Sequence, residues 1–366
     1  MPSPGCRGQC QELFLKVFAR SVGIGLLCEL ILVTTNKNIK ILLNYVIGPV
    51  VFCLLAWSIY RQLLRQNNWQ QSLQHAWRAI IGAEAWKLVL ALVLMLANWG
   101  LEARKWQIVI NRVQHLSFIQ SWKAVFTGTT LAFFTPNRIG EYMGRILYLD
   151  EGKRVKAISL TIVCSMGQLL VTWWAGIGGI LYLKAYGNTE LLHTFAPHTL
   201  LWLTMLLYFT VAVAVILTLF YFRLAGLVRW FEKVPRLQKP VSYIRVLESL
   251  NATILFRILS LSVLRYSVFI GQYYLLFDVF DVHVTATQVA GSVSVIFLVL
   301  SIVPTIAVIT ELGVRWKIGI EVVQLFDSNI TGILATSLAI WIINLVIPAL
   351  IGSLLILGIK IFNNRK

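Results

Sequence analysis

Two short stretches of the sequence place a glutamate and an arginine four residues apart inside strongly apolar surroundings. The first stretch, FTPNRIGEYMGR, contains Glu141 and Arg145, and the second, VPTIAVITELGVRWK, contains Glu311 and Arg315. In a helix this spacing places both side chains on one face, with the glutamate in the favourable N-terminal position. Charges within apolar segments indicate a functional site by default, but each pair can also simply neutralise itself. Both interpretations stay open at this point.

A threonine and a proline precede the first of these pairs. Thr135 is a good helix N-cap and Pro136 suits the first helical position, so we expect a helix to begin there. Such a helix would present free N–H groups and a positive dipole end, with Arg138 in its first turn and Arg145 two turns later on a similar face. Because the planar fork of arginine binds phosphate well, this arrangement predicts an anion site. In a bilayer the expected anion is a lipid phosphate.

Further polar residues interrupt the apolar runs. Arg265 lies about 12 residues from either end of its run, which is too deep for the side chain to reach the interface easily. Gln272 follows seven residues later on the same helix face. Gln168 recurs at helical spacing with Ser165 and Thr172. These three either line a polar path or join helices by hydrogen bonds, and the second interpretation is favoured.

Glycines and tryptophans in these segments have structural interpretations. Gly140 and Gly144 form a GxxxG pattern, which is typical of close helix packing. Trp86, Trp99, Trp106 and Trp122 are expected mostly to be anchors at the membrane interface.

The residue types favour a binding site over a catalytic centre. The cysteines lack the spacing of a zinc site, and the sequence contains no Walker loop or dinucleotide-binding glycine pattern. We therefore predict no catalytic residue, no metal and no cofactor. The candidate substrate-binding residues are Thr135, Pro136, Arg138, Glu141, Arg145, Arg265, Glu311 and Arg315, with Gln168, Gln272 and Glu102 as secondary candidates.

The composition places these residues in an integral membrane protein. The chain has 366 residues, of which 58% are hydrophobic and 13% are charged, whereas soluble domains are roughly half apolar and about 25% charged. Several runs reach the roughly 20 apolar residues that cross a bilayer as a helix. The predicted fold is an all-α polytopic bundle. The net charge of +17 fits lysine and arginine in cytoplasmic loops, and no basic stripe indicates nucleic-acid binding.

The apolar runs predict about six to eight spans and two re-entrant helix pairs. Two regions, 117–148 and 288–326, are broken by proline, glycine and charge, and these are the expected re-entrant pairs. The expected spans are 40–60, 82–101, 157–184, 199–222, 253–277 and 330–359.

The same pattern predicts an inverted repeat with half-repeats 82–184 and 253–359, joined by a basic cytoplasmic loop 223–250. The C-terminus is expected in the cytoplasm. The basic loops 61–81 and 102–115 flank a single span, so their sidedness stays open. Residues 1–37 are set apart as an uncertain N-terminal extension, for which a true start at Met1 and a later start both stay open, and 38–362 form one transmembrane domain.

Four segments, TPNRIGEYMGR, NWGLEARKW, LRYSVFIGQ and ELGVR, resemble the lysylphosphatidylglycerol synthase transmembrane region, a flippase-like family. The resemblance implies a bacterial inner-membrane protein that translocates or binds a lipid. In two-part members the membrane region moves an aminoacylated lipid that a separate soluble domain makes. This chain ends soon after its last apolar run, so aminoacyl transfer is not expected. Trp316 departs from the family's second motif and leaves the detail of that half-site open.

Three functions are compatible with these features. The leading hypothesis is a flippase-like transporter that binds an anionic lipid headgroup at a midplane arginine and glutamate site, with the glutamates balancing charge or holding a cationic part of the headgroup. The first alternative is a membrane-embedded transferase acting on a lipid phosphate, and the second is a non-transporting accessory membrane protein. The expected partner is a membrane lipid and not a nucleic acid, and a homo-oligomer stays open.

Overall fold

A computed structural model describes residues 82, 85–135, 138–186, 199–224, 226, 245–303 and 308–357. The described part consists of helices and short connections, without a strand, and five of its helices are long and apolar enough to cross a membrane: Ala85–Ile110, Glu151–Tyr186, Thr204–Phe222, Ala252–Val279 and Ile330–Ile356. This confirms the all-α polytopic fold class. The expected extension 1–37, the span 40–60, the loop 61–81 and most of the loop 223–250 lie outside the described residues.

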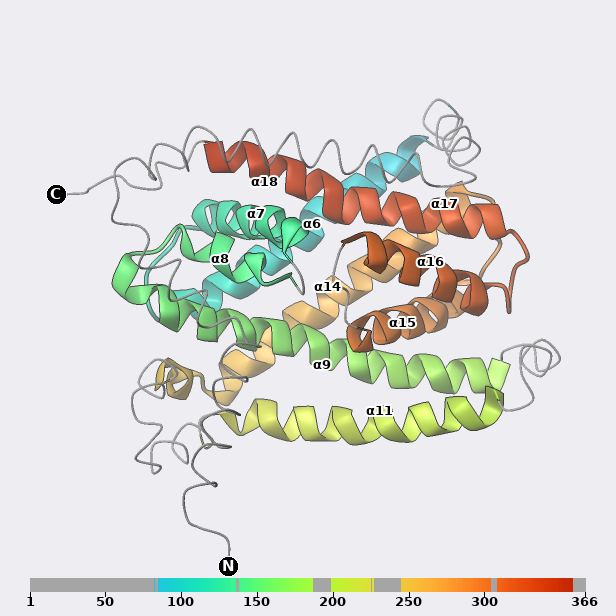
Figure 1. The fold of residues 1–366 in the computed structure, drawn as a ribbon, viewed down its shortest axis with the longest axis horizontal. Helices are drawn as coiled ribbons and strands as arrows, with labels where there is room; N and C mark the ends of the chain where they lie inside the picture. The colour runs from blue at the N-terminus through green and yellow to red at the C-terminus, as the bar shows by residue number, and fades with distance from the viewer. Residues whose placement is uncertain are drawn as a thin grey trace, which may run out of the picture.

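The elements follow one another along the chain as shown in Figure 1. They are α6 Ala85–Ile110, α7 Phe118–Phe134, α8 Gly140–Ile146, η4 Glu151–Lys153, α9 Arg154–Tyr186, α11 Thr199–Phe222, η6 Arg245–Ser249, α14 Ala252–Val279, α15 Ala286–Ile302, α16 Val308–Val323, α17 Ile330–Trp341, the π-helical turn η7 Ile342–Val346 and α18 Ile347–Leu357.

Two antiparallel helices, α6 and α14, form the centre of the molecule. Lys87 pairs with Asp278 at one end, and further along Gln272 Nε2 donates to the carbonyl of Ala91 at 2.9 Å. Near the other end, Lys105 Nζ lies 3.5 Å from Ser262 Oγ. Residue numbers therefore rise along one helix as they fall along the other. Gln272 takes part in this helix–helix packing.

The prediction of a basic loop at 102–115 is wrong at its start, because α6 continues to Ile110. Glu102 and Lys105 are buried within this helix and pair with each other at 2.7 Å. An ion pair lowers the cost of placing charges within a packed helix. The charges that predicted a loop are therefore part of a transmembrane-length helix.

Each interrupted region is a helical hairpin. We call α7 and α8 the first hairpin, and α15 and α16 the second hairpin. Both begin with a capping box. The Ser117 hydroxyl accepts a hydrogen bond from the Gln120 backbone N–H, and the Thr285 hydroxyl accepts one from that of Gln288. In return, each glutamine side-chain oxygen accepts a hydrogen bond from the backbone N–H of its cap residue. The hairpins lie in opposite halves of the molecule (Figure 1). The breaks are confirmed, whereas the entry of each hairpin from one membrane side stays a prediction.

Glycines allow the two helices of the first hairpin to pack closely. A Cβ atom on Gly144 would lie 2.5 Å from Gly128 Cα, so the α7 and α8 backbones meet without side chains between them. This confirms the close packing predicted from the GxxxG pattern.

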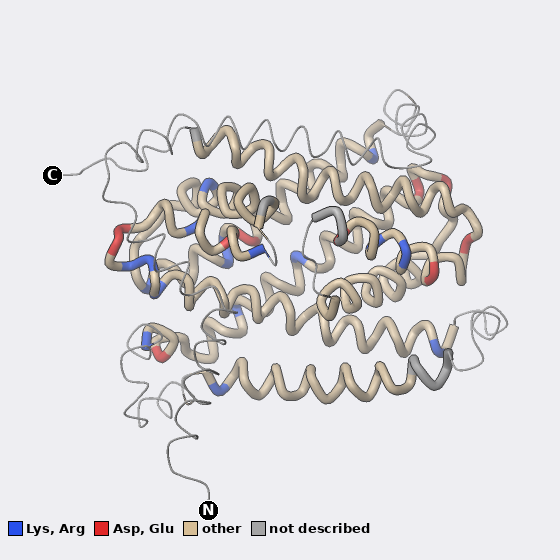
Figure 2. The backbone as a smooth tube through the Cα atoms, in the orientation of Figure 1, with Lys and Arg blue, Asp and Glu red and all other residues tan. Residues whose placement is uncertain are grey.

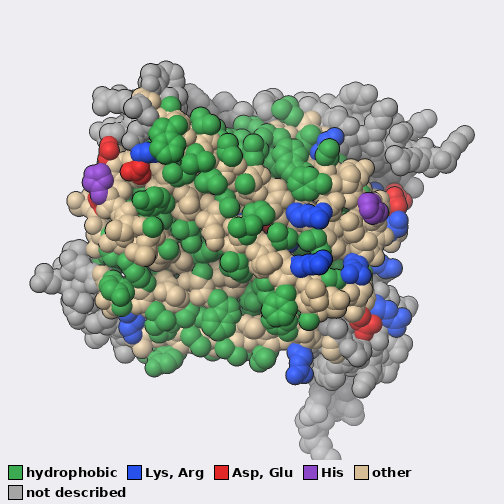
Figure 3. Space-filling model, turned by 180° about the vertical axis from the view of Figure 1, so that it is seen from behind, with side chains coloured by type: hydrophobic (Ala, Val, Ile, Leu, Met, Phe, Trp, Pro, Cys, Tyr) green, Lys and Arg blue, Asp and Glu red, His purple; other side chains and the backbone are tan. Residues whose placement is uncertain are grey.

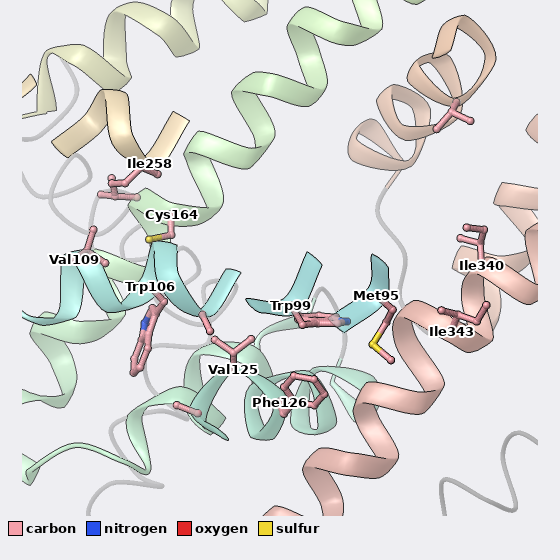
Figure 4. Close-up of a cluster of buried hydrophobic side chains, with 14 of the residues drawn as sticks. Met95, Trp99, Trp106, Val109, Val125, Phe126, Cys164, Ile258, Ile340 and Ile343 are labelled. Atoms are coloured by element: carbon pink, nitrogen blue, oxygen red, sulfur yellow. The ribbon is translucent and has the colours of Figure 1, made fainter. Parts of the chain in front are cut away.

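The apolar core surrounds α6. Trp99 and Trp106 are 3% and 0% exposed and pack within one cluster that also contains Phe126 (Figure 4). The prediction that these two tryptophans are interface anchors is therefore wrong. On the outer surface, hydrophobic side chains cover a broad band between the two ends of the molecule, and Lys and Arg gather toward one end (Figure 3).

Candidate functional site

A buried carboxylate on α6 connects three cations from three helices. Glu102 Oε2 lies 2.7 Å from Lys105 Nζ and 2.9 Å from Arg265 Nη1, and Oε1 lies 3.0 Å from Arg145 Nη2. Lys105 is on α6, Arg265 on α14 and Arg145 on α8, so the carboxylate ties the first hairpin to the central helix pair. We call Glu102 and these three cations the Glu102 cluster.

The first of the two predicted Glu–Arg pairs extends this cluster. Arg145 pairs with Glu141 on α8 as the spacing predicted, and Glu141 Oε2 also lies 3.8 Å from Arg138 Nε. The Arg145 side chain is only 1% exposed, whereas that of Arg138 is 46% exposed. The ion pairs therefore run from the half-exposed Arg138 at the hairpin break to the buried Glu102.

The second predicted pair forms in the other hairpin. Arg315 Nη2 donates to Glu311 Oε1 at 2.8 Å on α16, and Nη1 donates to the Tyr273 hydroxyl on α14 at 2.9 Å. The guanidinium also lies over the ring of Phe297 on α15, 5.8 Å from its centroid. This arginine is positioned by a phenol and a ring rather than by a second carboxylate.

Arg265 contacts four side chains of α6 and α14. Its Nε donates to Asn98 Oδ1 at 2.6 Å in addition to the Glu102 contact. The guanidinium lies 5.2 Å from the Trp99 ring centroid and 5.6 Å from that of Phe269. Two rings and two polar partners fix its position, so the cation is preorganised on α14.

The arginines from both hairpins and from α14 line one cavity of about 280 Å³. Charged residues occur here in the middle of the molecule as well as at its ends (Figure 2). The cavity is lined by Trp99, Arg138, Gln168, Thr172, Arg265, Tyr266, Phe269, Phe297, Leu300, Ser301, Glu311, Arg315, Ile340, Trp341, Asn344 and Leu345. Its size suits a lipid headgroup or another small polar group rather than a whole lipid.

The structure separates the predicted site residues into groups. Five of them line the cavity: Arg138, Gln168, Arg265, Glu311 and Arg315. Three lie behind it in the ion-pair chain: Glu102, Glu141 and Arg145. Thr135 lies at the break of the first hairpin, Gln272 lies in the α6–α14 packing contact, and Pro136 lies outside the described residues.

The predicted start of the helix after Thr135 is wrong. Helix α8 begins at Gly140, and Arg138 precedes it with a φ of 58°, in the left-handed region. Thr135 nevertheless caps the next helix, because its hydroxyl accepts a hydrogen bond from the Gly140 N–H at 2.7 Å. The hydroxyl that was expected to cap a helix beginning at the next residue thus reaches five residues ahead. Arg138 is therefore presented from the hairpin break and not from a first helical turn.

Several site residues were missed from sequence. Asn98 and Lys105 lie four and three residues from Glu102, which is the same-face spacing that identified the two Glu–Arg pairs. Asn344 lies in the π-helical turn η7 and lines the cavity, and its Oδ1 accepts from Asn98 Nδ2 at 3.4 Å. Such turns are frequent at functional sites, but no sequence pattern predicts them. Tyr273 was missed because its partner is 42 residues away.

The site carries an excess of positive charge. The ion pairs described above involve five cations and three carboxylates. The described residues contain no group of three or more His, Cys, Asp or Glu side chains that could hold a metal ion. The arrangement can therefore bind an anion through arginine, the side chain best suited to phosphate.

Comparison with known protein families agrees with the resemblance of the four sequence segments. The family model described as Lysylphosphatidylglycerol synthase TM region matches residues 41–352. This range includes every predicted site residue and both hairpins. A search of curated protein sequences finds no match.

Proposed function

The chain belongs to the family of the lysylphosphatidylglycerol synthase TM region, and from this premise we propose that it binds the phosphate-bearing headgroup of a membrane lipid and moves it across the bilayer. The observation that carries the proposal is the convergence of Arg138, Arg265 and Arg315 on one cavity. They come from the first hairpin, the central helix α14 and the second hairpin. A flippase needs such a polar site between apolar helices, because a headgroup cannot cross the hydrocarbon layer unaided.

Preorganised cations make this site suitable for phosphate. Arg265 and Arg315 are each held by polar partners and by aromatic rings. Little side-chain freedom is lost when such a group binds a ligand, so more of the interaction energy appears as affinity. Arg138 is half-exposed and is the cation that a headgroup can reach first.

The hairpins supply the elements whose movement would open the site. Residues of both hairpins line the cavity, and broken helices around a central site are typical of transporters that alternate between two membrane sides. In the proposal, the first hairpin opens to one side and the second to the other. The expected location is the bacterial plasma membrane.

The ion pairs favour transport over the transferase alternative. A transferase acting on a lipid phosphate needs a carboxylate that can accept a proton. Glu102, Glu141 and Glu311 are each already paired with at least one arginine, so a substrate would have to compete with a guanidinium group for these oxygens.

The proposal is tested by reconstitution into liposomes that contain a fluorescent phosphatidylglycerol. A membrane-impermeant reductant quenches the fluorescence of labelled lipid in the outer leaflet at once. The slower loss of fluorescence that follows measures how fast labelled lipid moves from the inner to the outer leaflet. We expect Arg138→Gln to slow this movement by about tenfold, the effect of losing roughly 1.4 kcal/mol of charge-assisted hydrogen bonding.

Arg104→Gln is the matched control, because Arg104 is an exposed arginine of α6 that donates to Gln107 and is not among the cavity-lining residues. Equal rates for wild type and Arg138→Gln, or equal losses in both variants, would show that the cavity is not the transport site.

A further inference from the structure

The carboxylates around the cavity indicate which headgroups it accepts. We propose that the site selects phosphate headgroups that carry a net negative charge and no ammonium group, with phosphomonoesters bound most tightly. This inference rests on the proposed function and adds the class of lipid. It differs from the expectation that Glu141 and Glu311 hold a cationic part of the headgroup.

The first step concerns the carboxylate on the cavity wall. Glu311 is the cavity-lining acid among the described residues, and Arg315 Nη2 donates to it at 2.8 Å. An ammonium group that approached Glu311 would have to compete with this guanidinium, which is positioned from two other directions by Tyr273 and Phe297. The wall therefore offers no unpaired carboxylate to an amine.

The second step concerns the carboxylates behind the wall. Glu102 is shared by Lys105, Arg145 and Arg265, and Glu141 is shared by Arg138 and Arg145. Each of these two carboxylates is therefore paired with more than one cation. An ammonium group in the cavity would be repelled by Arg265 and Arg138 without a compensating partner.

The third step is the balance of charge. Five cations against three carboxylates leave a formal excess of two positive charges around the cavity. Excess charge among apolar helices is unfavourable until a counter-charge arrives. A phosphomonoester brings nearly two negative charges at neutral pH, an anionic phosphodiester brings one, and a zwitterionic headgroup brings none in total.

The fourth step concerns donors without a partner. Arg315 Nε and the indole Nε1 atoms of Trp99 and Trp341 are buried and have no hydrogen-bond partner among the described residues. All three residues line the cavity. A buried donor is costly unless it is satisfied, so these three cavity-lining residues hold unused hydrogen-bonding capacity beside the site.

The test is a binding series with short-chain lipids that share the same acyl chains. Purified full-length protein is titrated at pH 7.5 with phosphatidic acid, phosphatidylglycerol and phosphatidylethanolamine, and binding is followed by microscale thermophoresis. We expect phosphatidic acid to bind about tenfold more tightly than phosphatidylglycerol, and phosphatidylglycerol about tenfold more tightly than phosphatidylethanolamine, since each charge at roughly 4–6 Å contributes at least this much.

Arg138→Gln and Arg104→Gln connect this preference to the cavity. Arg138→Gln should weaken phosphatidic acid about tenfold and phosphatidylethanolamine only slightly, whereas Arg104→Gln should leave all three affinities unchanged. If all three lipids bind equally and Arg138→Gln weakens them equally, the selectivity is wrong while the proposed headgroup site stands. If no lipid responds to Arg138→Gln, both the selectivity and the proposed function fail.

Discussion

The two hairpins carry the same Glu–Arg spacing, yet they hold the arginine in different ways. In the first hairpin, Arg145 is 1% exposed and pairs with Glu102 from α6 in addition to its own Glu141. In the second hairpin, Arg315 pairs with Glu311 and the neutral hydroxyl of Tyr273, and it lines the cavity. The comparison indicates that Arg145 fixes its hairpin to the core, whereas Arg315 faces the cavity.

The two helices of the first hairpin also pack against each other more closely than those of the second hairpin. In the first hairpin, the backbones of α7 and α8 touch at Gly128 and Gly144. In the second hairpin, α15 and α16 approach each other less closely, and Gly313 of α16 is exposed, with no atom within 4 Å of an added Cβ atom. We therefore expect α7 and α8 of the first hairpin to move as one unit when the site opens, and α15 and α16 to be freer to shift against each other.

The strongest test of this difference removes the charge of Glu102. Glu102→Gln leaves Lys105, Arg145 and Arg265 without their shared carboxylate, and breaking a buried ion pair costs about 3–5 kcal/mol. The free energy of unfolding, measured by denaturation in detergent, should fall by this amount.

Glu311→Gln is the matched control in the second hairpin. Its carboxylate pairs with Arg315 alone among the described residues, and the side chain is 18% exposed. The expected loss is about 1–2 kcal/mol. Equal losses of unfolding free energy in the two variants would contradict the distinction between Arg145, which fixes its hairpin to the core, and Arg315, which faces the cavity.

A second test adds one methyl group to each hairpin. In Gly144→Ala, the new Cβ would lie 2.5 Å from Gly128 Cα, so the backbones must separate, and overpacking of this kind costs about 1–3 kcal/mol. In Gly313→Ala, the same change meets open space within a helix and should stabilise by about 0.5–1 kcal/mol. Thermal unfolding of the two variants should therefore shift in opposite directions, and a shared direction would contradict the packing difference.

The sequence predicted the pairs within each helix but not the partners that give them different roles. Glu141 with Arg145 and Glu311 with Arg315 follow from spacing along one helix. Glu102 and Arg265 are separated by 163 residues, and no local pattern relates them. For the same reason the charges of α6 predicted a loop, because their burial depends on a helix far along the chain.

Helix spans were predicted better than the details of the site. Apolar length alone located the five described spans. The left-handed backbone of Arg138 and the π-helical turn at Asn344 are local departures from regular helix geometry. They depend on tertiary contacts, so hydropathy and spacing could not predict them.

The third test compares two tyrosines of α14 that lie seven residues apart. Tyr273→Phe removes the hydroxyl that accepts from Arg315 at 2.9 Å, and a hydrogen bond to a charged group contributes about 1.5–3 kcal/mol. Tyr266→Phe removes a neutral bond to Ser294 and should cost about 0.5–1.5 kcal/mol. Unfolding in detergent measures both losses. A larger loss for Tyr266→Phe would show that the hydroxyl of Tyr273 does not position Arg315.

The smallest expected change in stability concerns Arg138 at the break of the first hairpin. Its φ of 58° is strained for any residue with a Cβ atom, and glycine would remove a strain of about 1–2 kcal/mol while losing roughly 0.5–1 kcal/mol through the greater entropy of the unfolded chain. Arg138→Gly should therefore be about as stable as wild type. It should also be slightly more stable than Arg138→Gln, which keeps the strained backbone, and thermal unfolding in detergent measures both differences.

Both variants should lose phosphatidic acid binding alike, because both remove the guanidinium from the cavity. If glycine folds at least as well at this position, the arginine contributes its charge to the cavity rather than stability to the hairpin. If Arg138→Gly instead unfolds at a clearly lower temperature than Arg138→Gln, the side chain supports the hairpin, and the contrast between a structural Arg145 and a ligand-binding Arg138 within one hairpin is wrong.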